Sequence, residues 1–133
     1  MQNGSCLCGA VAFRISGEMR DVLACHCQQC RKTSGHYWAA TSVRDATLEM
    51  TRKVGLAWFR ASDTAQRGFC NLCGSTLFWK PDNADRTAVS AGALDGATGL
   101  ELSQHVFVAD KGDYYALSDG KPQHTQFSGG EDA

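Results

Sequence analysis

The sequence predicts a mainly β domain with little helix. Several runs of residues alternate between apolar and polar side chains with a period of two, as half-buried strands do. Turn-forming residues separate these runs, and helical periodicity is almost absent. The chain has 133 residues, of which 43% are hydrophobic and 20% are charged. This length and composition are typical of one globular domain, which we expect to span residues 1–133.

Five runs carry the strand pattern. In the first, Val11, Phe13 and Ile15 share one face, and further strands are predicted at 57–61, 76–80, 87–91 and 102–108. In the last of these runs, His105 and Phe107 lie on the face opposite to Leu102, Gln104, Val106 and Val108. Turns are predicted at 16–17, 67–68, 81–83, 95–96 and 119–120.

One short helix is predicted at 28–33, ending at Ser34 and Gly35, because glycine suits the left-handed position that follows a helix. The end of the chain, residues 127–133, is expected to be frayed. The strand spacing of the large aromatic side chains assigns six of them to the core: Trp38, Trp58, Trp79, Phe59, Phe78 and Phe107.

The charge balance argues against several classes of partner. Thirteen Lys and Arg residues against fourteen Asp and Glu residues give a formal net charge of −1, so no strong positive field is present to bind nucleic acid. No apolar run reaches the roughly 20 residues of a membrane span. The N-terminus carries neither a basic segment nor an apolar signal stretch, which predicts a cytoplasmic protein.

Seven cysteines are the most informative feature of the sequence. Because seven is odd, complete internal disulfide pairing is impossible, and in a reducing compartment clustered thiols bind metal more often than they form disulfides. The cysteines fall into three closely spaced groups, which are Cys6 and Cys8, then Cys25, Cys27 and Cys30, then Cys70 and Cys73. Short loops bring sulfurs to one tetrahedral zinc at little cost in entropy. Gly9 and Gly74 each follow a cysteine group and allow backbone N–H groups to turn toward the sulfurs.

The seven cysteines divide into four and three. A closed structural zinc site has four protein ligands, whereas a catalytic zinc keeps three protein ligands and one open position. One grouping joins Cys6 and Cys8 to Cys70 and Cys73, and leaves Cys25, Cys27 and Cys30 for a second zinc. The rival grouping joins Cys27 and Cys30 to Cys70 and Cys73, and leaves Cys6, Cys8 and Cys25 over. Spacing alone does not decide between them.

A zinc with three cysteine ligands favours thiol chemistry over water activation. Three thiolates and one Zn²⁺ carry a net charge of −1, which makes the metal a poor Lewis acid. The soft site still accepts a fourth sulfur and ionises the thiol that it binds. Arg31 and Lys32 directly follow Cys30, and basic side chains there can contact an anionic thiol substrate.

The four histidines raise an alternative interpretation of the second zinc site. If His26 or another histidine closed the second site, that zinc would be structural as well, because Cys₃His is a frequent structural set. The chain would then be a non-enzymatic zinc-binding module for a protein partner. His26 lies between two cysteines and is expected to point away from the sulfurs. His36 can reach the open position or act as an acid–base group, whereas His105 is expected in the core and His124 at the surface.

The cysteine motifs resemble those of the glutathione-dependent formaldehyde-activating enzymes, a family that includes centromere protein V. Residues 4–11 are similar to the opening motif of the family, residues 25–32 with Ser34 and Gly35 to its central motif, and residues 67–75 to its third. Residues 92–95 and 105–108, followed by Lys111, resemble its later segments. The chain departs from the family at 113–115, because members often carry Pro-Trp after the late lysine.

The resemblance implies a zinc-stapled β-sheet domain of the Mss4-like kind, with two Zn²⁺ ions per chain. It implies a structural zinc on Cys6, Cys8, Cys70 and Cys73 and a catalytic zinc on Cys25, Cys27 and Cys30. The implied enzyme is a carbon–sulfur lyase similar to S-(hydroxymethyl)glutathione synthase, which acts on adducts of glutathione or another small thiol with formaldehyde or another aldehyde. The identities of the thiol and the aldehyde, and the oligomeric state, stay open.

Overall fold

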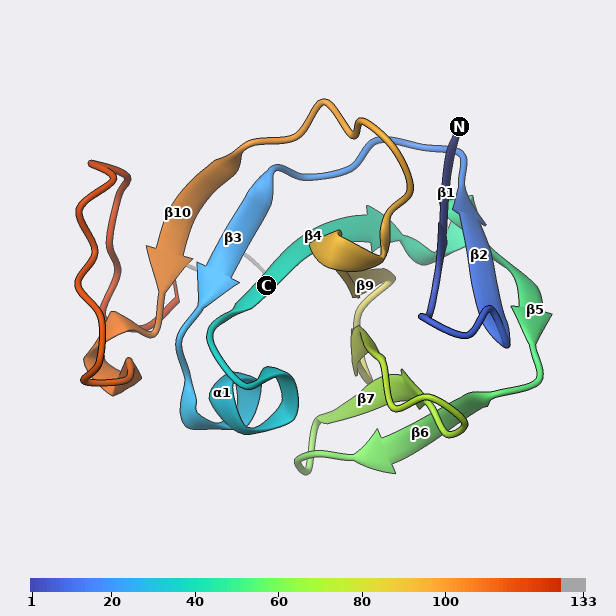
Figure 1. Ribbon diagram of the computed structural model, residues 1–133, viewed down its shortest axis with the longest axis horizontal. Coiled ribbons are helices and arrows are strands. Elements are labelled where there is room, and N and C mark those ends of the chain that lie inside the picture. The colour runs from blue at the N-terminus through green and yellow to red at the C-terminus, as the bar shows by residue number, and fades with distance from the viewer. Residues whose placement is uncertain (128–133) are drawn as a thin grey trace.

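The computed structural model describes residues 1–127 (Figure 1), and its backbone there is mainly β, which confirms the predicted fold class. Two sheets contain the strands. The three-stranded sheet has the order β1 (Gln2–Ser5), β2 (Val11–Ile15), β5 (Leu48–Lys53). The seven-stranded sheet has the order β10 (Leu102–Val106), β3 (Val22–Cys25), β4 (Trp38–Arg44), β9 (Arg86–Ser90), β8 (Thr76–Pro81), β7 (Ala65–Cys70), β6 (Leu56–Arg60).

The helices within residues 1–127 are short. The α-helix α1 (Gln28–Ser34) follows β3, and single 3₁₀ turns are found at η1 (Asp45–Thr47), η2 (Ala91–Ala93) and η3 (Val108–Asp110). No helix in this part of the chain has the length and apolar character needed to cross a membrane. In Figure 1 the three-stranded sheet lies at one end of the molecule, and β10 with the C-terminal segment lies at the other.

The three-stranded sheet is built around β2, whose side chains alternate as predicted. Val11, Phe13 and Ile15 are buried, and the residues between them are partly exposed. Gly4 in β1 pairs with Phe13, and a Cβ at Gly4 would lie 2.7 Å from the backbone oxygen of Ala93. Glycine therefore allows β1 to close against both β2 and η2.

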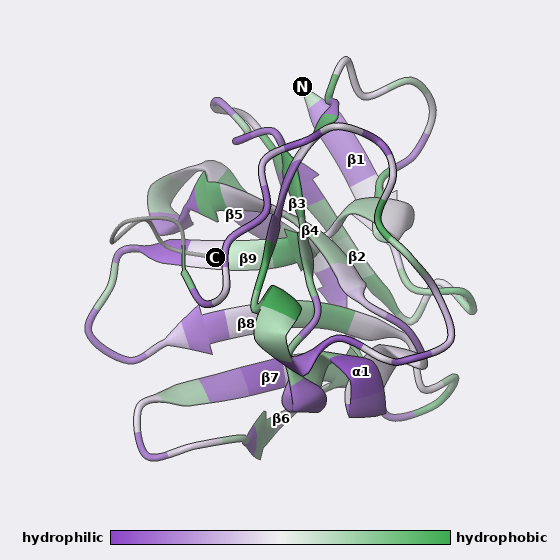
Figure 2. Cartoon of the chain, turned by 90° about the vertical axis from the view of Figure 1, so that its left-hand side faces the viewer, coloured by the Kyte–Doolittle hydropathy of each residue, from purple (hydrophilic) through white to green (hydrophobic). Residues whose placement is uncertain are grey.

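The central strands of the seven-stranded sheet are buried along most of their length, and Figure 2 shows β9, β8, β7 and β6 of this sheet lying side by side. Leu23, Ala24 and Cys25 are all buried in β3, and β4 is buried at five of its seven positions. Such strands show no alternation, which is why the sequence pattern did not reveal them. The β10–β3 pair is parallel, whereas the other pairs of this sheet are antiparallel.

Several local predictions are wrong in detail. The strand predicted at 102–108 ends at Val106, because Phe107 adopts a left-handed conformation with φ of 54° and the 3₁₀ turn η3 follows it. The turn predicted at 67–68 is absent, since Arg67 and Gly68 lie inside β7. A register shift between Gly68 and Phe69 interrupts the pairing with β8 there.

The helix and part of the aromatic core agree with the sequence. Gly35 ends α1 with φ of 89° and donates its N–H to the backbone oxygen of Arg31. Trp38 and Phe78 are buried, but Trp58 and Phe59 are 44% and 63% exposed. Both lie on β6, an edge strand that among residues 1–127 pairs with β7 alone, so the core assignment of these two side chains is wrong.

Two clusters of buried side chains stabilise the fold. The larger one packs β2 against β8 and β9 and includes Cys6 and Cys70. The smaller one surrounds Cys25 and Cys30 with Trp38, Leu23 and Val106. Of the tail expected to be frayed, residues 128–133 lie outside the described residues. Phe127 packs edge to face on Phe107, with 4.7 Å between the ring centroids.

Candidate functional site

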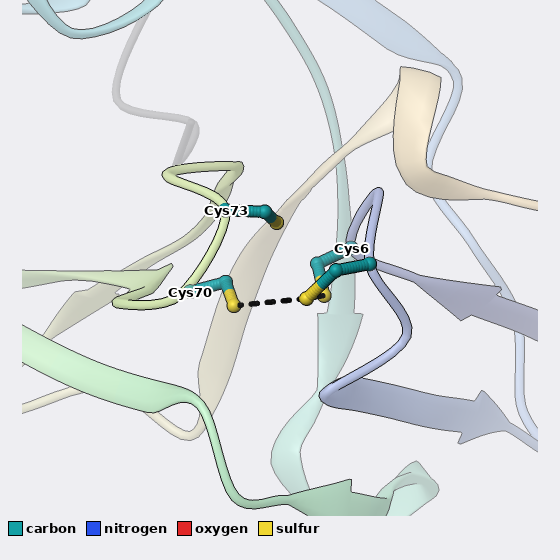
Figure 3. A group of neighbouring side chains, drawn as sticks. Cys6, Cys70 and Cys73 are labelled. Carbon is teal, nitrogen blue, oxygen red and sulfur yellow. Dashed lines mark hydrogen bonds between the residues drawn. The ribbon is translucent and has the colours of Figure 1, made fainter.

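Four cysteines from distant parts of the sequence meet at one point. Cys6 and Cys8 lie on the loop between β1 and β2, whereas Cys70 ends β7 and Cys73 lies in the turn before β8. Their four sulfurs all lie within 4.8 Å of one another. Figure 3 shows the side chains of Cys6, Cys70 and Cys73 pointing toward a common centre from these two segments. We call this group the first cluster.

The sulfur spacing of the first cluster fits a tetrahedral zinc. Cys8 Sγ lies 3.7 Å from Cys6 Sγ and 3.8 Å from Cys70 Sγ. Four sulfurs at the usual Zn–S distance of about 2.3 Å in a tetrahedron are about 3.8 Å apart. All seven cysteines are free thiols, and four thiolates are a donor set that zinc prefers.

Backbone N–H groups and one serine surround the sulfurs of the first cluster. Cys6 Sγ accepts from the N–H of Val11 at 3.3 Å, and Cys70 Sγ accepts from the N–H of Leu72 at 3.4 Å. Ser75 Oγ lies 3.1 Å from Cys73 Sγ and accepts from the N–H of Leu7, so it joins the two loops. Its hydroxyl is the first cause that lowers the pKa of Cys73, to about 5. These donors favour thiolates, the form that binds metal.

Glycines shape both loops of the first cluster. Gly9 and Gly74 have φ of 82° and 79°, and a Cβ at either position would meet no neighbouring atom. Each glycine donates its own N–H to the carbonyl oxygen of the first cysteine of its pair. Glycine is therefore needed at these two positions for its left-handed backbone conformation, which is costly for other residues, and not because a larger side chain would lack space.

The other three cysteines form the second cluster. Cys25 ends β3, Cys27 is the N-cap of α1, and Cys30 lies in the first turn of that helix. Their sulfurs lie within 4.8 Å of one another, and Cys25 and Cys30 are buried. Cys27 Sγ accepts from the N–H of Cys30 at 3.3 Å. The grouping in space is thus four and three, and Cys27 and Cys30 do not join Cys70 and Cys73.

The charge in the second cluster is concentrated at Cys27. Hydrogen bonds from the thiols of Cys25 and then Cys30 hold the pKa of Cys27 well below its usual range, and the Arg67 guanidinium contributes. Arg67 Nη2 also lies 3.4 Å from Cys30 Sγ and donates to it. The second cluster therefore combines an easily ionised thiol with a buried cation.

No histidine or carboxylate completes the second cluster among residues 1–127. The ring of His26 is buried and both of its nitrogens have other partners, since Nδ1 is hydrogen-bonded to Tyr115 Oη and Nε2 lies 2.9 Å from His105 Nδ1. His36 Nδ1 lies 2.6 Å from Tyr114 Oη. Within the described chain, three sulfurs are the protein donors that this site offers to a metal.

A chain of hydrogen bonds connects the second cluster to the C-terminal segment. From Tyr115 it passes through His26 to His105, whose Nε2 lies 2.8 Å from Asp119 Oδ2. Burial and the nearby His105 lower the pKa of His26 to about 4, so its ring is neutral. His105 is buried, as predicted. The chain positions residues 115–119 behind the loop that carries Cys25 and Cys27.

Comparison with known proteins identifies the family. Residues 1–110 match the family described as glutathione-dependent formaldehyde-activating enzyme. The chain belongs to this family. A protein of Schizosaccharomyces pombe, described as an uncharacterized lyase, is 28% identical over 114 residues, which are 84% of this chain and 82% of that protein. The crystal structure of a Rhodobacter sphaeroides protein has a TM-score of 0.61 at 26% identity, covering 73% of this chain and 91% of that one.

Trp38 lines two hollows in this member of the formaldehyde-activating enzyme family. The larger is a groove of about 590 Å³ that is rich in hydroxyl groups, among them those of Ser34, Thr76 and Ser90. The smaller is a cavity of about 70 Å³ at the second cluster, lined in part by Cys25 and Cys30. Trp38 Nε1 donates to Ser90 Oγ at 2.7 Å, which holds the indole that lines both hollows in place.

Four side chains around the second cluster have no site role predicted from the sequence. They are Gln29, which accepts from Arg67 Nε, Arg67 itself, Tyr115 and Asp119. Lys32, which was expected near an anionic substrate, is exposed, whereas Arg31 is half-buried. Two signals in the sequence pointed to Arg67: it opens the third family motif at 67–75, and it lies two residues after the buried Ala65 in β7. A charged residue is not expected on a buried face, however.

Replacing Tyr115 by phenylalanine tests the hydrogen-bond chain. We expect Tyr115→Phe to lower the free energy of unfolding by about 1–3 kcal/mol, because the buried Nδ1 of His26 loses its partner. Tyr114→Phe is the matched control, since Tyr114 is 63% exposed and its loss should stay within about 0.5 kcal/mol. Chemical denaturation of the zinc-loaded variants measures both, and equal losses would show that His26 does not depend on Tyr115.

Proposed function

We propose that the protein is a zinc-dependent carbon–sulfur lyase, which joins or separates a small thiol such as glutathione and formaldehyde or another aldehyde. The observation that carries the proposal is the second cluster, which offers three sulfurs and, among residues 1–127, no fourth histidine, cysteine or carboxylate donor. A catalytic zinc keeps one position open in this way. Membership in the formaldehyde-activating enzyme family supports the same reaction.

In this proposal Cys25, Cys27 and Cys30 hold the catalytic zinc, and Cys6, Cys8, Cys70 and Cys73 hold a structural zinc. A zinc ion bound to the second cluster supplies one kind of chemistry, which is to keep an added thiol ionised at neutral pH. The surrounding protein excludes water, because Cys25 and Cys30 are buried. Trp38 lines both the cavity at the second cluster and the larger groove, and its indole is held in place by Ser90.

The groove beside Trp38 supports a thiol of the size and polarity of glutathione. Its volume of about 590 Å³ lies in the usual range of roughly 300–1,000 Å³ for small-molecule sites. Hydroxyl groups on its wall can donate to carboxylates and accept from amides. Arg31 is half-buried on α1, two residues before Thr33 on the groove wall, and its Nε has no hydrogen-bond partner among residues 1–127.

The first experiment is to measure zinc per chain on purified, chelator-washed protein before and after adding excess glutathione. We expect two zinc ions, of which one is labile or altered by the thiol, and then thiol-dependent consumption of aldehydes in a screen that begins with formaldehyde. With cobalt in place of zinc, the absorption bands should change when glutathione enters the ligand shell of the metal. One tightly held zinc, or two that ignore the thiol, would contradict the proposal.

The same measurements address the non-enzymatic alternative, a zinc-binding interaction module. That alternative requires a closed second site with a histidine ligand. The hydrogen bonds of His26 to Tyr115 and His105, and of His36 Nδ1 to Tyr114, support the open site instead. A cobalt spectrum of a closed site with nitrogen in its ligand shell, unchanged by thiol, would favour the module.

A further inference from the structure

Arg67 is the most deeply buried of the arginine and lysine side chains among the described residues, with 6% of its surface exposed. Two of its three guanidinium nitrogens have partners: Nε donates to Gln29 Oε1 at 2.5 Å, and Nη2 donates to Cys30 Sγ at 3.4 Å. The third, Nη1, is buried and has no hydrogen-bond partner among residues 1–127. Leaving a buried, charged donor of this kind without an acceptor is destabilising.

The position of Arg67 connects this unpaired donor to the second cluster. Arg67 lines the cavity of about 70 Å³ together with Cys25, Cys30 and Trp38, and the remaining wall is largely apolar, with Leu23 and Phe107 among its residues. The guanidinium carbon lies 5.3 Å from the centre of the Trp38 ring. Stacking on Trp38, together with the bonds to Gln29 and Cys30, fixes the plane of the guanidinium and hence the direction of Nη1.

Phe107 gives a second sign that this cavity has a function. It is the one residue other than glycine with a positive φ among residues 1–127, and a bulky side chain rarely adopts this conformation. Strained backbone of this kind is concentrated at ligand sites. The strain places an aromatic wall at the cavity that Arg67 lines.

The charges of the second cluster indicate what Arg67 can bind. Three thiolates with one zinc have a net charge of −1, which Arg67 neutralises, so the site as a whole repels neither a neutral carbonyl nor its oxyanion. The volume excludes anything beyond a few heavy atoms. A small oxygen acceptor on one or two carbons therefore fits the unpaired N–H, the apolar wall and the size together.

We propose that Arg67 Nη1 is the oxygen-binding group of the active site, which donates a hydrogen bond to the carbonyl oxygen of a small aldehyde and to the alkoxide that forms from it. This inference rests on the proposed lyase function and adds a catalytic residue to it. The small volume of the cavity also limits the substrate to an aldehyde with one or two carbon atoms.

The reaction then balances as follows. The thiol loses its proton to solvent, and the sulfur electron pair forms the bond to the aldehyde carbon. The electron pair of the C=O π bond moves to oxygen, where Arg67 Nη1 stabilises the charge, and the alkoxide takes up a proton from solvent. In the lyase direction the hydroxyl proton leaves to solvent and an oxygen electron pair re-forms the C=O bond. The electron pair of the C–S bond moves to sulfur, and the released thiolate takes up a proton from solvent.

Formate is a suitable probe, because it is a one-carbon oxyanion that enters a cavity of this size and does not react with thiols. Calorimetric titration of the zinc-loaded protein with sodium formate measures binding without any turnover. We expect wild type to bind formate and Arg67→Lys to bind it at least about 10-fold more weakly, while zinc per chain and melting temperature stay unchanged. The lysine keeps a positive charge near Cys30 but not the rigid fork of donors.

The kinetic expectation separates binding of the oxygen from binding of the thiol. Removing one donor to a developing oxyanion lowers kcat by about 10²–10³-fold, so Arg67→Lys should show this loss with the KM of the thiol unchanged. Arg60→Lys is the matched control, because Arg60 lies on the neighbouring strand β6, is half exposed and contacts Asp82. It should bind formate and turn over as wild type does.

A third variant tests the location of the site. Phe107→Trp should fill the cavity and abolish formate binding while zinc content is retained. This matters because Arg67 also lines a hollow on the side of Phe59 and Phe69, which Phe107 does not reach. Formate affinity unchanged in Phe107→Trp would overturn the assignment to this cavity.

The outcomes separate the inference from the function on which it rests. Absence of formate binding in wild type, or equal affinity and kcat in wild type and Arg67→Lys, would overturn the oxygen site. If the same wild-type protein then still condensed thiol and aldehyde, the proposed function would stand without it. If formate binding depended on Arg67 but no thiol and aldehyde condensed, the proposed lyase function would be wrong. The assignment of Arg67 as an oxygen-binding group would still hold.

Discussion

Cys6→Ala is expected to prevent folding. The first cluster joins two loops whose sulfurs approach within 4.8 Å, and a structural zinc contributes on the order of 10 kcal/mol or more. That is comparable to the whole net stability of a domain, about 5–15 kcal/mol. Cys6 is also buried in the larger core cluster, so its replacement removes packing as well as a ligand. Cys73→Ala should have the same result through the metal alone, because Cys73 is only partly buried.

Leu7→Ala is the control for this prediction. Leu7 lies between Cys6 and Cys8 but is 90% exposed, so the free energy of unfolding should change by less than about 0.5 kcal/mol. Circular dichroism during heating and zinc per chain measure both variants. A soluble Cys6→Ala protein that melts cooperatively near the wild-type temperature would show that the first cluster does not stabilise the fold through zinc.

Cys27→Ser is expected to remove the second zinc and the activity while the fold is kept. Serine is a strong N-cap residue, so it can replace the capping bond that Cys27 Sγ accepts from the N–H of Cys30. The sulfur ligand is lost, however, and zinc per chain should fall from two to one. Thiol–aldehyde condensation should fall by more than about 100-fold, the upper end of what loss of an outer partner of a metal ligand costs.

Gln28→Ala is the matched control, because Gln28 is the exposed neighbour of Cys27 at the start of the same helix. It should keep two zinc ions and wild-type turnover. The decisive measurement is metal content together with the melting temperature, since a folded Cys27→Ser protein with one zinc assigns the lost activity to the second cluster. Full zinc content and full activity in Cys27→Ser would contradict the proposed mechanism.

The sequence predicted those parts of the fold that face water on one side. The alternation of Val11, Phe13 and Ile15 gave β2, and Gly35 gave the end of α1. The buried strands β3 and β4 were not predicted. Residues such as Leu23 and Ala24 face protein on both sides of the sheet, so apolar and polar residues do not alternate there. The edge strand β6 was found, but its position in the sheet was not, so the exposure of Phe59 was missed.

Local patterns also predicted only part of the candidate site. Sulfurs that lie two or three residues apart are close in any compact loop, so the cysteine groups could be read from their spacing. The partners of those groups depend on contacts between distant strands. Arg67 reaches Cys30 because β7 lies beside α1, and Tyr115 reaches His26 across 89 positions. Side-chain partnerships of this kind follow from sheet order, which local patterns do not contain.

The two clusters differ in how much of the chain must be present before they can form. Cys8 and Cys70 are 62 positions apart, so the first cluster cannot be completed during synthesis until residue 73 has left the ribosome. The second cluster needs only residues 25–30, and closing so short a segment costs little entropy. A growing chain can thus load a metal at the second cluster well before the first exists. Under the proposed function, the catalytic metal site can therefore form early in synthesis, whereas the site that joins the two distant loops forms only after residue 73 has been made.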